Sequence, residues 1–283
     1  MLHLPEFIVA SREGLYVANR AKWRQLADGH FFGVALKGSE IYCFQHSSRR
    51  KSRLGDTGGA IVRFTIEDGQ LSMPDLVATG FDSDCHQIEF YNDSFYLVDT
   101  RNQRILEFDD IWRPTATHQI LPMVTEETDT CYGHINSIAG WNESIYVMLH
   151  NASRGIDSEV IVYDLSFNEV RRKQLPSAGC HDIVMLPSDE FLYCESSKGS
   201  VSRSDGMTVR IDNLFTRGLA IGRNEMAVGS SLYGARPIRK FLPGFITFLD
   251  YDFKRLGRHY FPAAPTQIRY LPETMEPFLS VDC

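Results

Sequence analysis

The segment CHQIEFYNDSFYLVDTRNQRILEFD, residues 85–109, predicts three short β-strands joined by tight turns. Its runs HQIEFY, FYLVDT and ILEF are rich in aromatic and β-branched residues, which partly alternate with polar ones as in half-buried strands. Turn-forming residues 92–94 separate the first two runs, and a polar corner at residues 101–104 precedes the third. The segment therefore indicates most of one antiparallel sheet.

Similar strand–turn–strand units recur along the whole chain, without a long amphipathic helix between them. Their first strands lie near six positions: Phe32, His86, Asn136, His181, Arg217 and Thr266. The average spacing of about 45–50 residues is typical of the blades of a β-propeller. We predict an all-β propeller of about six four-stranded blades, in which both sheet faces are buried. Five or seven blades stay open, because the register at the two ends is weakly defined.

The two ends of the chain are expected to complete one blade together. The last repeat, from Thr266, stops before it has supplied its outer strands, whereas FIVAS and GLYVAN, residues 7–11 and 14–19, are two strands without a blade. Pairing them would close the ring within a single domain, residues 1–283. The sequence leaves open which of the four strands comes from which end.

Charge and composition narrow the class of partner. The formal net charge is −7, which disfavours nucleic acid and anionic membranes as main partners, because phosphate binding needs a basic field. The first 20 residues lack the basic and apolar regions of a signal peptide, and no apolar run is long enough to span a membrane. We therefore expect a cytoplasmic protein whose six scattered cysteines are free thiols.

Residues 98–109, VDTRNQRILEFD, resemble the consensus of the NHL repeat, with Asp99, Asn102, Arg104 and Ile105 in place. In that corner an Asp satisfies turn amides, so the resemblance implies a structural role for Asp99. The whole chain also resembles uncharacterised bacterial six-bladed propellers that share segments like HINSI, RGLA and ITFLDYDF, residues 134–138, 217–220 and 246–253. Both resemblances imply the fold, and neither implies an activity.

More distantly, the chain is similar to the gluconolactonase and senescence-marker group of propellers and to the strictosidine-synthase group. The metal site of the first group needs Glu and Asn or Asp side chains at the inner ends of the blades. Here the comparable positions carry His86, Asn136, His181 and Arg217. The sequence therefore departs from a calcium lactonase site, and no local motif of the second group is present.

Histidines gather at one predicted mouth of the propeller channel. Six of the nine fall at the starts of innermost strands or the ends of second strands: His30, His46, His86, His134, His150 and His181. We assign His86, His134 and His181 as candidate ligands of a divalent transition metal, zinc or iron, since imidazoles around an axis suit such ions. His134 and Asn136 are two apart, which on a strand places them on one face. The alternative is that each ring caps the channel structurally.

Acid–base and anion-binding candidates surround these histidines. Glu195 and His150, at second-strand ends, are the candidate catalytic groups. Arg217 and Asn136 occupy innermost positions, where they would contact substrate. Two basic loops, with Arg49 and Arg50 in one and Arg236 and Arg239 in the other, would hold an anionic group, unless they are merely solvated.

Matched Cys–His pairs offer a second pattern, at Cys85–His86 and Cys180–His181. A mixed zinc or iron site is conceivable, but adjacent residues of a strand face opposite ways. Thiols buried between blades are the favoured interpretation.

The leading hypothesis is a small-molecule enzyme, or enzyme-like binder, with a His-rich mouth that receives a small anionic metabolite or sugar derivative. Lyase, isomerase, hydrolase and oxygenase chemistry all stay open, because no catalytic signature is present. The rival hypothesis is a non-catalytic propeller scaffold that binds a protein or glycan. Fold alone does not decide between them.

Overall fold

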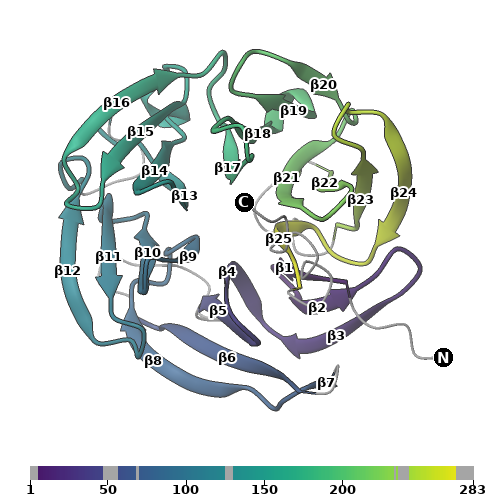
Figure 1. Cartoon of the computed structure of the whole chain (residues 1–283), viewed down its shortest axis with the longest axis horizontal. Coiled ribbons are helices and arrows are strands. Elements are labelled where there is room, and N and C mark those ends of the chain that lie inside the picture. Colours follow the sequence, from purple (N-terminus) through teal and green to yellow (C-terminus); the bar gives the residue numbers. More distant parts are fainter. Residues whose placement is uncertain are drawn as a thin grey trace, which may run out of the picture.

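Six antiparallel sheets surround a central axis in the computed structural model of the chain (Figure 1). The structure describes residues 6–46, 57–67, 70–124, 130–232, 234 and 242–271. Each sheet has four strands, and the short β7 (Gln70–Leu71) adds a fifth to one of them. The predicted six-bladed propeller with four-stranded blades is confirmed.

Each blade runs from an innermost strand at the axis to an outer strand at the rim. The innermost strands are β4 (His30–Lys37), β9 (Ile88–Tyr91), β13 (Ile135–Trp141), β17 (His181–Met185), β21 (Phe215–Ile221) and β25 (Pro265–Tyr270). The second strands are β5 (Glu40–His46), β10 (Ser94–Asp99), β14 (Ser144–Leu149), β18 (Phe191–Glu195), β22 (Met226–Ser231) and β1 (Phe7–Ser11). The third strands are β6 (Gly59–Glu67), β11 (Arg104–Phe108), β15 (Glu159–Asp164), β19 (Ser200–Arg203), β23 (Gly244–Leu249) and β2 (Gly14–Ala18). The outer strands are β8 (Asp75–Phe81), β12 (Pro114–Gln119), β16 (Glu169–Gln174), β20 (Thr208–Arg210), β24 (Arg255–Phe261) and β3 (Trp23–Asp28).

The two ends of the chain share the sixth blade, as predicted. Its strand order is β25-β1-β2-β3, so the C-terminal part supplies the innermost strand and the N-terminal part supplies the other three. In the β1–β25 pair Val9 lies opposite Ile268, and both are fully buried. Hydrogen bonding between β1 and β25 therefore closes the ring, which settles the question that the sequence left open.

A buried aliphatic residue in every innermost strand packs between blades. Each belongs to a separate apolar cluster, and the six are Val34, Ile88, Ile138, Ile183, Leu219 and Ile268. Burying one such side chain contributes about 1.5–3 kcal/mol. These six residues give a common reference along the inner strands, and the residues one and two places before them are equivalent from blade to blade.

The NHL-like corner has the structural role that the resemblance implied. The Asp99 carboxylate accepts hydrogen bonds from Asn102 Nδ2 at 2.9 Å and from Arg104 Nε at 2.7 Å, and it is 1% exposed. It therefore holds the turn between β10 and β11.

The five described cysteines are free thiols, as expected, and four of them are buried: Cys43, Cys85, Cys180 and Cys194. Cys131 is exposed, and Cys283 lies outside the described residues. Within the described ranges, no helix is long and apolar enough to cross a membrane.

Candidate functional site

A small polar cavity lies on the propeller axis. Its lining comes from all six blades, from the residues one and two places before the buried aliphatic position: Phe32, His86, Gln87, Asn136, Ser137, His181, Asp182, Arg217, Thr266 and Gln267. Its volume is about 10 Å³, which is room for roughly one water-sized particle. A larger ligand must therefore bind at the mouth above the cavity.

Hydrogen bonds between neighbouring innermost strands hold this ring in place. Gln87 Oε1 accepts from the backbone N–H of Ile138 at 3.0 Å, and Gln267 Oε1 accepts from that of Val34 at 2.5 Å. The shorter Asp182 side chain accepts from Gly218 N–H at 2.8 Å. Side chains next to the axis thus bond one blade to the next.

Two blades carry glycine at the equivalent position instead. A Cβ on Gly33 would lie 2.6 Å from His86 O and 2.7 Å from Ile88 N, so β4 and β9 approach closely only without a side chain. Gly218 has a φ of +83°, in the left-handed region that glycine tolerates. Backbone contact replaces side-chain bridging at Gly33.

The imidazoles of His86 and His181 are held in the same way in two blades. His86 Nδ1 lies 2.8 Å from Asp84 O and 2.8 Å from Thr100 Oγ1. His181 Nδ1 lies 3.1 Å from Gly179 O and 2.8 Å from the hydroxyl of Ser196. Because a carbonyl oxygen can only accept, Nδ1 carries the hydrogen in both rings. The lone pair is therefore on Nε2, at the opposite edge of each ring.

Both rings are neutral at neutral pH. Burial, followed by the nearby Arg217 charge, lowers the pKa of His86 to about 3. Burial, Arg217 and neighbouring imidazoles lower the pKa of His181 well below its ordinary value. A neutral ring with a fixed tautomer presents Nε2 as a proton acceptor or a metal ligand.

Aromatic contacts connect all six histidines that the sequence placed at the mouth. The successive ring centroids are 4.6 Å apart for His30–His46, 4.6 Å for His30–Phe32, 4.6 Å for Phe32–His86, 5.1 Å for His86–His134, 4.9 Å for His134–His150 and 4.9 Å for His150–His181. The structure therefore brings these residues together in one row, in which Phe32 joins the two groups of imidazoles.

The expectation that His134 and Asn136 share one strand face is wrong. His134 has a φ of +52°, and the β13–β14 register shifts between Ile135 and Ser137. Strand alternation does not hold across such a bulge. Asn136 lines the axial cavity and donates to Cys180 O at 2.8 Å, whereas His134 lies beside the rings of His86 and His150.

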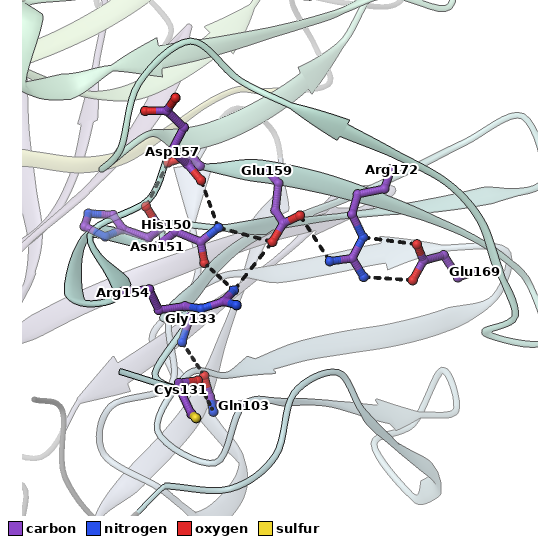
Figure 2. Close-up of polar contacts among 11 residues, drawn as sticks. Gln103, Cys131, Gly133, His150, Asn151, Arg154, Asp157, Glu159, Glu169 and Arg172 are labelled. Carbon is purple, nitrogen blue, oxygen red and sulfur yellow. Dashed lines mark hydrogen bonds and ion pairs between the residues drawn. The ribbon is translucent and has the colours of Figure 1, made fainter. Parts of the chain in front are cut away.

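A polar network fixes the loop that carries His150 (Figure 2). Asn151 is fully buried and left-handed, with a φ of +59°, and its Nδ2 donates to Asp157 O and Glu159 Oε1 at 3.0 and 3.2 Å. Arg154 donates to Asn151 Oδ1 at 3.1 Å, and Figure 2 shows the network continuing through Glu159 to Arg172. This network holds the end of β14 at the mouth.

His150 has the opposite tautomer from His86 and His181. Its Nδ1 accepts a hydrogen bond from the backbone N–H of Ala152 at 3.4 Å, so the ring hydrogen is on Nε2. Burial and the Arg217 charge lower its pKa to about 4. Neutral His150 is thus a hydrogen-bond donor whose ring centroid lies 4.9 Å from that of the acceptor His181.

Two residues with no assigned role in the sequence analysis, Phe32 and Arg12, belong to the mouth. The Cζ atoms of Arg217 and Arg12 lie 5.2 and 5.7 Å from the centre of the Phe32 ring. Arg12 directly follows β1, a second strand, and so matches the positions of His46 and His150. Assigning β1 to a blade would have revealed it from the sequence.

The Glu195 carboxylate is already engaged. It is 3% exposed and accepts from Ser177 at 2.8 Å, from Ser202 at 2.5 Å and from Lys198 at 2.5 Å. Burial raises the pKa of this carboxyl, but these hydrogen bonds outweigh it and the pKa is lowered. The catalytic role of Glu195 stays a prediction, and its contacts are those of a fixed structural charge.

Other predicted site residues are placed less completely. Arg49, Arg50, Arg236 and Arg239 lie outside the described residues. In the part of the chain that the structure describes, no three His, Cys, Asp or Glu side chains are arranged to hold a metal ion. The zinc or iron site stays a prediction.

Comparison with known proteins identifies the fold alone. No family profile and no curated protein matches the sequence. A chain of a nidogen/laminin complex is structurally similar, with a TM-score of 0.68, 9% identity and coverage of 94% of this chain and 98% of that one. A Bacteroides caccae protein of unknown function gives a TM-score of 0.59 at 13% identity, with 94% and 99% covered. A streptogramin B lyase gives 0.52 at 12% identity, with 95% and 93% covered. The chain is thus built like several propellers of different function.

Proposed function

We propose that the chain is a small-molecule enzyme that binds an anionic compound at the propeller mouth and uses neutral imidazoles for proton transfer. One observation carries the proposal: His86 and His181 are both held as Nδ1–H tautomers by a backbone carbonyl and a hydroxyl. Their Nε2 atoms have no hydrogen-bond partner among the described residues. A buried base kept neutral in this way is suited to accept a proton from a bound compound.

The charges around these rings support an anionic reaction partner. Arg217 disfavours protonation of His86, His150 and His181, and thereby keeps them in the basic form. With Arg12, it would also stabilise negative charge on a substrate that loses a proton. The Nε2–H group of His150 would donate a hydrogen bond to the same compound, as a neutral electrophile. The substrate, an anionic metabolite or a sugar derivative, and the reaction class stay open.

The same neutral Nε2 atoms are also in the state that binds a metal ion. Elemental analysis of the purified protein tests the predicted zinc or iron. The metal part of the proposal holds if a stoichiometric metal is present and disappears in a protein carrying both His86→Asn and His181→Asn.

The test of the enzyme uses asparagine variants, because Asn136 already occupies the equivalent position in the third blade. The purified chain is incubated in D2O with a pooled panel of small anionic metabolites, and consumption or deuterium incorporation is followed by proton NMR. We expect at least one compound to react, and to react about 10²–10⁴-fold more slowly with His86→Asn or His181→Asn. His259→Asn, at an exposed position on β24, is the matched control.

Two results would overturn the proposal. One is that no compound reacts, and the other is that both variants react as fast as the unmodified chain. Binding of a protein or glycan without turnover would then favour the scaffold hypothesis.

A further inference from the structure

Two amide groups on the wall of the axial cavity have unsatisfied hydrogen-bond donors. Gln87 and Gln267 line the cavity and are 4% and 2% exposed. Among the described residues, their Nε2 atoms are buried without a hydrogen-bond partner. Leaving a buried donor unpaired costs about 1–3 kcal/mol, so such groups in native proteins indicate a bound partner.

The orientation of both amides is unambiguous. A backbone N–H can only donate, so the atom that faces Ile138 N and the atom that faces Val34 N must each be the amide oxygen. The nitrogen is therefore the other atom in both side chains. Flipping either amide would place two donors against each other and would break a bond between blades.

The unsatisfied groups on this wall are donors, so the missing partner is a hydrogen-bond acceptor. Arg217 adds a positive charge to the same lining. Asp182 also lines the cavity, but its Oδ2 accepts from Gly218 N–H, and burial raises the pKa of this carboxyl although Arg217 acts in the opposite direction. The lining therefore favours an occupant with one negative charge.

The size of the cavity restricts the occupant further. About 10 Å³ admits one acceptor atom and not a whole phosphate group. A planar carboxylate can place one oxygen in the cavity and still reach a guanidinium group, whose planar donors match it.

We propose that Gln87 and Gln267, with Arg217, form a receptor for one oxygen of a carboxylate, so that the mouth binds a small carboxylic acid. This inference rests on the proposed function and names the chemical class of its substrate. It assigns the two glutamines to binding, and the reaction itself stays with the imidazoles above them. The remainder of the acid would lie in the mouth, beside the rings of His86 and His181.

The test measures binding of simple carboxylates to the full chain. Acetate and formate replace chloride or nitrate at constant total anion concentration, while the side-chain amide signals of Gln87 and Gln267 are followed by ¹H–¹⁵N NMR and the melting temperature is recorded. We expect both signals to shift saturably with acetate and formate, and the melting temperature to rise in parallel.

Gln87→Glu is the informative variant. It keeps an oxygen for Ile138 N–H and replaces the donor with a second oxygen, so the apparent dissociation constant for acetate should rise at least about tenfold. Gln267→Glu serves as a second variant, because either one alone could destabilise the ring. Gln174→Glu, at an exposed position on β16, makes the same change of charge away from the axis and should bind acetate normally.

Each contrary outcome is distinct. Equal shifts with chloride, nitrate and acetate would replace the carboxylate receptor by a site for any small monoanion. No shift with any anion would show that the cavity holds water only. Normal acetate binding by both Gln→Glu variants would also overturn the inference. Carboxylate binding without turnover of any compound would overturn the proposed function alone, whereas turnover of compounds without a carboxylate would overturn this inference alone.

Discussion

The guanidinium carbon of Arg217 lies 5.2 Å from the centre of the Phe32 ring, and the ring of His86 stacks on the same phenyl group at 4.6 Å. Phe32 and Arg217 come from the first and the fifth blades, and the axis of the propeller brings them together. A cation on an aromatic face contributes about 0.5–2 kcal/mol. This contact fixes a positive charge next to the imidazoles that we assign to proton transfer.

Replacing Arg217 should raise the pKa of the mouth histidines. In Arg217→Met, the lost positive charge no longer disfavours the protonated form of His86, His150 and His181, so each ring should bind a proton at a higher pH. Burial still acts on all three and keeps each pKa below its ordinary value. The measurement is the pH titration of the histidine ring signals by NMR. Arg223→Met, at an exposed site, is the control, and unchanged titrations in Arg217→Met would contradict the electrostatic account.

His86 should make the stability of the protein depend on pH. Its folded pKa of about 3 lies below the unfolded value near 6.5, so the unfolded chain binds more protons between these values. The stability that neutral His86 contributes is complete above pH 6.5 and is lost as the pH falls toward 3. Between pH 7 and pH 5 the free energy of unfolding of the unmodified chain should fall by about 2 kcal/mol more than that of His86→Asn.

Urea unfolding at the two pH values measures this difference. Raised carboxyl pKa values, such as about 7 for Glu89, act with the opposite sign, but they are present in both proteins and cancel in the comparison. Equal pH dependence of the two proteins would show that His86 does not stay neutral in the folded chain.

A methyl group on Gly33 should disturb the joint between the first and second blades. Gly33→Ala places Cβ against the backbone at His86 O and Ile88 N, neither of which can move aside as a flexible side chain would. We expect a loss of about 1–3 kcal/mol of stability by urea unfolding. Gly38→Asn is the comparison, because Gly38 faces open space at a φ of +57°, which asparagine tolerates. Equal stability of Gly33→Ala and the unmodified chain would contradict the close approach of β4 and β9.

Truncating Phe7 should weaken the closure of the ring. Phe7 is 1% exposed and packs on the rings of Phe248 and Tyr270, at centroid distances of 5.8 and 5.9 Å. Phe7→Ala should cost about 3–5 kcal/mol and should speed amide hydrogen exchange in β1 and β25 first. Trp23→Ala, where the side chain is half exposed, should cost much less. Uniformly faster exchange in all blades would show that closure is not a separate weak point.

The repeat was predictable because its signals are local. Alternating apolar residues and turns such as residues 92–94 specify each hairpin, whatever the rest of the chain does. Closure followed from the two unassigned strands, but its three-plus-one division did not, because the strand patterns alone do not fix which end supplies the innermost strand.

The site was predictable only where strand position alone determines it. His86 and His181 were found because they begin innermost strands, whereas the alternation argument failed at His134, where a left-handed residue interrupts the strand. The roles of Gln87 and Gln267 depend on contacts between blades that exist only once the ring is closed. The tautomers of the histidines depend on Thr100, Ser196 and two carbonyl groups, which no spacing rule connects to them. Lys198, three residues after Glu195, was the available signal that this carboxylate has a partner.

The division of the sixth blade also sets an order of events during synthesis. The ribosome makes β1, β2 and β3 first, and β25 only about 240 residues later. At about 5–20 residues per second, the three early strands wait roughly 12–50 s for their innermost neighbour. Throughout that time β1 has an open edge, with Ile8 and Val9 on a strand that is later fully covered. The nascent chain therefore offers a chaperone a defined binding strand, whose release coincides with the arrival of residues 265–270.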